Sequence, residues 1–179
     1  MCGPLIWPTA LLGVGLVASS QRDVRPAPPP LENHEVAPCR DAVAGVWTAR
    51  VWRDAAEEWD EVVLTIRRDG DALDGEIVVT TWDGDRNQHE PPQCPDRSPA
   101  ISRVVQLGRG SLDGAGFDFQ GSGPRRVEVP CGQTPSGTYH PDHFTGELDR
   151  STEQLHTRND DGNVDDGRPH DFQRTRCQP

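Results

Sequence analysis

Apolar and polar residues alternate along most of the chain from residue 39 onward. Short runs such as Phe117-Asp118-Phe119 and Val127-Glu128-Val129 place an apolar residue at every second position. This period is typical of β-strands with one buried face and one wet face. Glycine, proline, aspartate and asparagine, which favour turns, separate the runs. The pattern predicts strands near residues 46–53, 59–67, 72–82, 102–108, 115–120, 125–130, 143–149, 152–158 and 170–176.

An all-β domain follows, because no segment keeps a convincing helical period. Short strands at this spacing are typical of barrels and sandwiches. We expect a single antiparallel up-and-down barrel of eight or nine strands over residues 39–177, with a β-sandwich as the alternative.

Two hairpins can be aligned residue by residue. A turn at residues 54–57 gives two apolar inner pairs, one outer charge pair and one outer aromatic pair: Trp47–Leu64, Ala49–Val62, Arg50–Glu61 and Trp52–Trp59. Such agreement across both faces is expected of a real hairpin. For the next turn, at residues 68–71, we expect Ile66 opposite Leu73 and Leu64 opposite Gly75.

The first and last predicted strands carry a family resemblance. Gly45-Val46-Trp47 opens the first strand, and Arg174 and Arg176 lie on the last strand before Cys177. These features resemble the lipocalins and the wider calycin barrels. The resemblance implies that Arg174 or Arg176 packs across Trp47, and by analogy that the barrel binds a ligand.

The beginning of the chain predicts export. Residues 5–18 form an almost uninterrupted apolar run that is shorter than the roughly 20 residues of a transmembrane helix. We therefore interpret residues 1–20 as a signal peptide, although no Arg or Lys precedes the run. Residues 21–38 are rich in proline and have little to bury, which predicts a disordered linker. A secreted or periplasmic protein without stable membrane insertion is the expected product.

The cysteines support an oxidising compartment. Cys39, Cys94, Cys131 and Cys177 remain after the leader, are widely spaced and contain no Cys-x-x-Cys pair. An even strand count in a closed sheet brings Cys39 to Cys177 and leaves Cys94 for Cys131. An odd count would favour Cys39 with Cys131 and Cys94 with Cys177.

Composition and charge exclude several function classes. The formal net charge is -11, so phosphate backbones and anionic lipid surfaces repel the chain, and we expect no nucleic-acid partner. Every cationic residue is arginine, which excludes Schiff-base chemistry and a phosphate-loop lysine. No motif identifies a reaction, so we predict a non-enzymatic protein without a cofactor.

Two segments contain residues that metals use. The carboxylate-rich run at residues 159–167 is a calcium candidate, but Val164 stands where an EF-hand needs glycine and His170 where it needs glutamate. We interpret this run as a solvated hairpin loop. The segment at residues 139–143 contains His140 and His143, with His89 and Glu90 as distant helpers. A polar turn is favoured here, because a third zinc ligand is missing, and we predict no metal.

Binding is the predicted function. A barrel of this kind would take a small apolar or amphipathic ligand, with Trp47, Leu64, Ile77 and Phe119 as its wall and Trp82 at its rim. The alternative is a secreted protein-binding module, such as a protease inhibitor, acting on an extracytoplasmic protein. It would use the proline-rich loop around Cys94 or the Trp52/Trp59 face. A remote alternative is an envelope hydrolase that uses His140 and His143.

Overall fold

A computed structural model of the chain describes residues 39–93, 101–131, 139–162 and 167–178. The chain there forms the strands β1 (Gly45–Arg53), β2 (Glu58–Asp69), β3 (Ala72–Asp83), β4 (Ile101–Asp113), β5 (Gly116–Cys131), β6 (His143–Asp149), β7 (Gln154–Asn159) and β8 (Arg168–Cys177). These ranges contain no helix, and hence none long and apolar enough to cross a membrane. The predicted signal peptide, residues 1–20, and linker, residues 21–38, lie outside the described residues.

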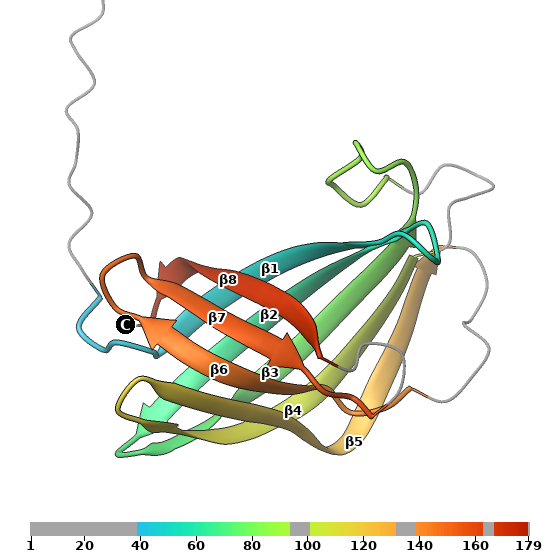
Figure 1. The fold of residues 1–179 in the computed structure, drawn as a ribbon. Coiled ribbons are helices and arrows are strands. Elements are labelled where there is room, and N and C mark those ends of the chain that lie inside the picture. Colours follow the sequence, from blue (N-terminus) through green and yellow to red (C-terminus); the bar gives the residue numbers. More distant parts are fainter. Residues whose placement is uncertain (1–38, 94–100, 132–138, 163–166, 179) are drawn as a thin grey trace, which may run out of the picture. The chain divides into compact units, whose positions relative to one another are not determined.

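The strands form one closed antiparallel barrel in which sequence neighbours pair and β1 pairs with β8 (Figure 1). The predicted up-and-down barrel is therefore confirmed, and the sandwich alternative is wrong. Strands β1, β3, β5 and β7 all finish at the same end of the barrel, which we call the open end. β1 begins and β8 finishes at the other end, which we call the closed end.

One strand is longer than the alternation predicts. The expected strands at 115–120 and 125–130 are a single strand, β5. Residues 121–124 contain two glycines and a proline and suggest a break, but the β4–β5 ladder continues past them with a register shift. β6 pairs with β5 only over residues 116–120, so β5 extends beyond its shorter neighbour toward the open end (Figure 1).

The first hairpin has the predicted register, and the second does not. All four predicted β1–β2 pairs are present. In the second hairpin Ile66 pairs with Gly75 instead of Leu73, a shift of two residues that keeps each side chain on its expected face. Gly70, with φ of 62°, starts the turn, a conformation that glycine adopts without strain. A Cβ on Gly75 would lie 1.7 Å from the Thr65 carbonyl oxygen, so the two strands approach too closely there for any other residue.

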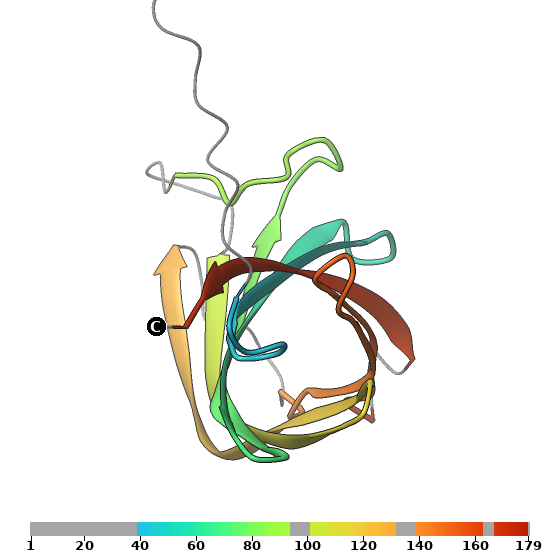
Figure 2. The ribbon, with the colours of Figure 1, turned by 90° about the vertical axis from the view of Figure 1, so that its left-hand side faces the viewer.

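Apolar side chains fill the interior toward the closed end. Besides the four predicted wall residues, the core contains Val43, Ala49, Val62, Ile66, Leu73, Val79, Leu112, Phe117, Phe144, Leu148, Leu155 and Phe172. Each fully buried Leu, Ile or Phe contributes about 1.5–3 kcal/mol to folding. The segment before β1 folds across this end of the ring (Figure 2). Its Val43 is fully buried, and the Val43 carbonyl accepts a hydrogen bond from Trp47 Nε1 at 2.7 Å.

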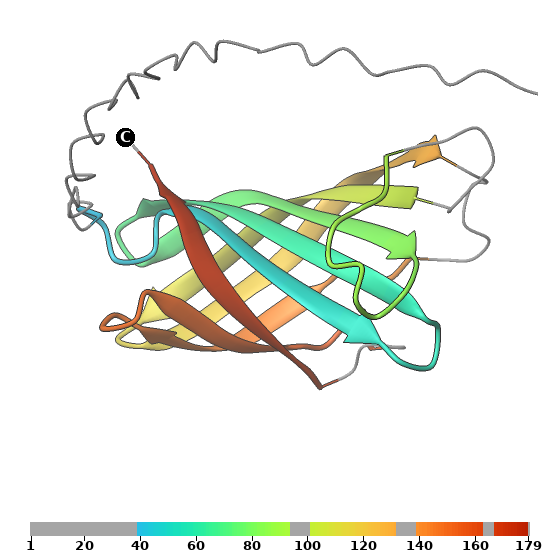
Figure 3. The same cartoon turned by 90° about the horizontal axis from the view of Figure 1, so that it is seen from above.

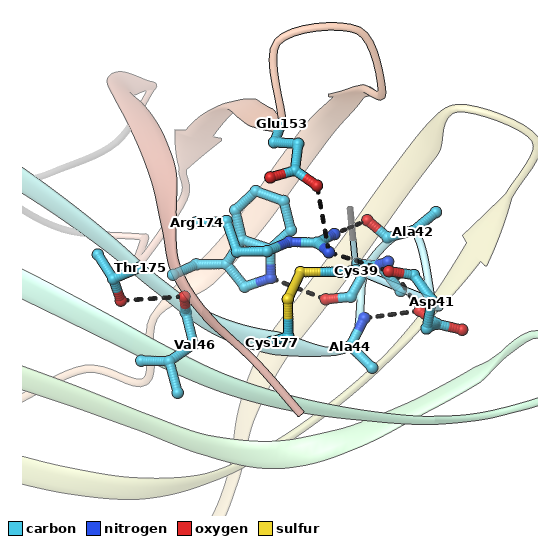
Figure 4. The surroundings of a disulfide bond; sticks show 11 residues. Cys39, Asp41, Ala42, Ala44, Val46, Glu153, Arg174, Thr175 and Cys177 are labelled. Atoms are coloured by element: carbon cyan, nitrogen blue, oxygen red, sulfur yellow. Dashed lines mark hydrogen bonds and ion pairs between the residues drawn. A yellow bond between two sulfur atoms is a disulfide. The ribbon is translucent and has the colours of Figure 1, made fainter. Parts of the chain in front are cut away.

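Arg174, on β8, joins that strand to the segment before β1 at the closed end (Figure 4). Its guanidinium carbon lies 4.5 Å from the centroid of the Trp47 ring, and its side chain is 3% exposed. The guanidinium donates to the carbonyl of Asp41 at 2.9 Å and to that of Ala42. Arg176 is exposed, so Arg174 is the arginine that crosses the tryptophan.

A disulfide lies beside this contact. Cys39 is bonded to Cys177, with their Cα atoms 5.4 Å apart, as the even strand count predicted. The bond closes a loop of 138 residues. It lowers the conformational entropy of the unfolded chain, which stabilises the folded protein by about 5 kcal/mol in the chain-entropy model. Cys131 is also disulfide-bonded. Cys94 lies outside the described residues, so its pairing with Cys131 stays a prediction.

Replacing Arg174 with alanine should destabilise the protein by about 2 to 4 kcal/mol, because a cation–π contact and charged hydrogen bonds are lost together. Urea unfolding followed by circular dichroism measures the change. Arg176→Ala is the matched control, and it should shift the free energy of unfolding by no more than about 0.5 kcal/mol. Equal effects of the two substitutions would contradict the assignment of Arg174.

Candidate functional site

The four predicted wall residues lie together in the barrel interior. Trp47, Leu64, Ile77 and Phe119 have no solvent-accessible surface, so no space of water size adjoins them. The Phe119 ring lies so close to Gly108 that a Cβ there would be 2.3 Å from a ring carbon. At this level the barrel is filled by its own side chains.

Inward positions become charged toward the open end. Arg53 Nε lies 2.8 Å from Asp60 Oδ2, and Thr81 Oγ1 donates to the same carboxylate at 2.6 Å. Arg53 also pairs with Glu58. Burial raises the pKa of Glu58, and the facing Asp83 raises it further against the opposing effect of Arg53. A charged mouth of this kind does not suit an apolar ligand.

Successive side chains of β3 point alternately to the inside and the outside of the barrel. Ile77 points inward, so Trp82, five positions later, points outward. It is fully buried nonetheless. Its ring stacks on Trp59, with centroids 6.4 Å apart, and its Nε1 donates to the Gln88 carbonyl at 3.4 Å. The described part of the β3–β4 loop thus covers Trp82, which lies on the outer face and not at the rim of the barrel interior, where the sequence analysis placed it.

The seam between β1 and β8 is paired over only half its length. Pairing runs from Gly45 to Thr48 on β1 and from Gln173 to Cys177 on β8. Residues 49–53 pair only with β2, and residues 168–172 only with β7. The two strands diverge toward the open end (Figure 1, Figure 3), which leaves two strand edges facing each other across a gap.

A groove lies at this gap. We call it the β1–β8 groove, and its lining residues are Arg50, Val51, Trp52, Trp59, Arg86, Asn87, His89, Pro169 and Asp171. Its volume is about 500 Å³, within the roughly 300–1,000 Å³ of small-molecule sites. Three segments far apart in the sequence, the first hairpin, the β3–β4 loop and β8, meet there.

Aromatic rings form one wall of the groove. Trp52 and Trp59 face each other across the first hairpin, as predicted, with ring centroids 5.5 Å apart. His89 packs edge-on against Trp59 at 4.8 Å. The Trp59 ring is 7% exposed and its Nε1 donates to the Asp85 carbonyl at 3.1 Å, whereas Trp52 is half-buried. Trp52 therefore offers the accessible aromatic surface, and Trp59 supports it.

Charged groups border the aromatic wall and fix its geometry. Asp54, in the β1–β2 turn, accepts a hydrogen bond from Trp52 Nε1 at 2.8 Å. The same Oδ1 atom lies 3.4 Å from an Arg86 nitrogen. Arg50 Nε donates to Glu61 Oε2 at 2.6 Å. Asp54 thus orients both the indole and one guanidinium of the groove.

A buried carboxylate holds the chain before β6 inside the barrel. Asp142 accepts hydrogen bonds from Gln106 Nε2 at 2.6 Å, from Asn159 Nδ2 at 2.8 Å and from the Tyr139 hydroxyl. Burial raises the pKa of Asp142 above its ordinary value, although the three donors oppose the shift. Sequence reasoning treated this residue as part of a surface turn.

The candidate metal ligands do not come together as one site in the described ranges. His140 is exposed, and His143 Nε2 lies 2.9 Å from Asp118 Oδ2 on the outer face. His89 belongs to the aromatic wall, and Glu90 is exposed. Residues 163–166 of the acidic run lie outside the described residues. Within the described ranges, no group of three or more His, Cys, Asp or Glu is arranged to hold a metal ion.

Sequence reasoning found half of the groove. The outer Trp52–Trp59 pair follows from the hairpin register. Arg86, Asn87 and Asp171 were missed, because their position depends on how a loop and a distant strand fold against that hairpin. For the two loop residues, the signals were the polar composition of residues 83–89 and the length of the segment without a strand pattern that they begin.

The pKa of Asp142 leads to a prediction about stability. A carboxyl whose pKa is raised by folding stabilises the fold most below its unfolded pKa, and this contribution is lost as pH rises through the folded pKa. The stability of the wild type relative to Asp142→Asn should therefore fall as pH rises from about 4 toward 7. Urea unfolding of the wild type and of Asp142→Asn between about pH 4 and pH 7 measures this change in relative stability. If the stability of the wild type relative to Asp142→Asn stays constant or increases as pH rises, folding does not raise the pKa of Asp142.

Comparisons with known proteins return no match, either to a family model, to a curated protein or to a solved structure.

Proposed function

We propose that this chain is an exported, non-enzymatic binding protein that takes a small amphipathic ligand in the β1–β8 groove. One observation carries the proposal: a concave site of about 500 Å³ combines an aromatic wall with guanidinium groups. Concave sites with an apolar wall and a few oriented polar groups are typical of small-molecule binding. The packed interior favours the groove over the barrel lumen.

Export is supported by the Cys39–Cys177 disulfide, because structural disulfides are typical of oxidising compartments. A secreted or periplasmic location is therefore part of the proposal. A relationship to the calycins is proposed as well. It is supported by the eight-stranded closed barrel and by Arg174 lying over Trp47.

The alternative, a protein-binding module, would use the same Trp52/Trp59 face. Native mass spectrometry of protein purified from its own host separates the two: a bound small mass supports the proposed function, and a co-purified polypeptide supports the alternative.

The neutral fluorescent probe phenylnaphthylamine (NPN) tests the groove directly. Its fluorescence should rise on binding, and Trp52→Ala should weaken binding about tenfold, because the accessible ring surface is lost. Leu107→Ala is the matched control, since Leu107 is 55% exposed on the outside of β4 and is not part of the groove. The proposal is wrong if NPN fails to bind, or if Leu107→Ala weakens binding as much as Trp52→Ala.

A further inference from the structure

We propose that the β1–β8 groove is selective for planar apolar molecules that carry an anionic group, with the rings against Trp52 and the anion beside Arg50 and Arg86. This inference rests on the proposed function and names the chemical class of its ligand. Two properties of the groove support it: the unused donors of its arginines and their spacing from the aromatic wall.

The groove is lined by guanidinium groups, each of which has a carboxylate neighbour. The formal net charge of the protein is -11, yet two arginines and one aspartate line the groove. The aspartate, Asp171, lies 2.8 Å from His156 Nδ1, a neighbour outside the lining. Glu61 beside Arg50 and Asp54 beside Arg86 lie outside the lining, so the lining offers an anion hydrogen-bond donors and not a net positive charge.

The two guanidiniums keep hydrogen-bond donors for a ligand. Within the described ranges Arg50 uses its Nε with Glu61, and Arg86 uses one nitrogen with Asp54 at the long distance of 3.4 Å. A guanidinium has five N–H donors, so most donors of both side chains are unused by described partners. Carboxylates, sulfonates and phosphates match such donors in geometry and charge.

The spacing suits a molecule with an anion at the edge of a ring system. Arg50 and Trp52 lie two residues apart on β1 and so project from the same face, about 6.6 Å apart along the strand. A ring placed on Trp52 brings a substituent at its edge over Arg50. Asp54 orients Trp52 and Arg86 together, which places the second guanidinium beside the same ring.

A matched pair of probes tests the selectivity. Anilinonaphthalene sulfonate (ANS) has the ring system of NPN plus one sulfonate. ANS should bind the full-length wild-type protein about tenfold tighter than NPN, because a charge-assisted contact is added. Added salt should weaken the binding of ANS but not of NPN.

Variants test whether the two arginines cause the tighter binding of ANS. Arg86→Gln changes a side chain that is 71% exposed, and the double variant Arg50→Gln/Glu61→Gln leaves no unpaired carboxylate. Each should weaken ANS binding about three- to tenfold, and should weaken NPN binding by a smaller factor. Arg126→Gln, on β5 and outside the groove, makes the same charge change as Arg86→Gln and should alter neither affinity.

The outcomes separate this inference from the proposed function. If NPN binds in a Trp52-dependent manner but ANS binds no more tightly, or if the arginine variants affect both probes equally, anion selectivity is wrong and the proposed function stands. If neither probe binds, both are wrong. If ANS is preferred and Arg126→Gln removes the preference as strongly as Arg86→Gln, general surface charge is responsible and the inference is overturned.

Discussion

Pairing of the first strand with the last is the constraint on which the rest of this structure depends. Residues 45–48 of β1 pair with β8, and there Arg174 covers Trp47 and a disulfide joins the flanking segments. Beyond Thr48 the two strands separate. Pro169 lies on the unpaired part of β8, and because proline has no N–H it cannot donate across the seam. Strand pairing between β1 and β8 thus closes the barrel near the closed end and stops halfway along the seam.

The two halves of the barrel differ in chemistry as a consequence. The closed half contains the large, fully buried apolar side chains, while inward positions at the open end are charged and paired with one another. The separated seam instead creates a concavity on the outside of the sheet, where the β3–β4 loop packs on Trp59 and Trp82. The protein can therefore keep a well-packed interior and still present a binding surface.

Local rules predicted the parts of the fold that depend on neighbouring residues. Alternation and turn residues give the strands, and the first hairpin has a single register that satisfies both faces. The predicted register of the second hairpin was wrong by two residues, because both registers keep each side chain on the same face. Only the close approach of the two strands at Gly75 distinguishes the two registers. The sequence pattern predicted two strands in place of β5, because the glycines in its middle signal a break. Pairing with β4 continues past these glycines and keeps β5 a single strand. The groove is lined by residues more than 80 positions apart, such as Trp52 and Asp171, and a single sequence has no local signal for bringing them together.

Backbone amide hydrogen exchange along β1 and β8 tests the half-paired seam most directly. Amides that point away from β2 within residues 45–48 should exchange only on global unfolding, because each is paired with β8. Outward amides within residues 49–53 should exchange at least about a hundredfold faster, since they have no strand partner across the gap. Uniform slow exchange along the whole of β1 would show a fully paired seam and would contradict the account of the groove.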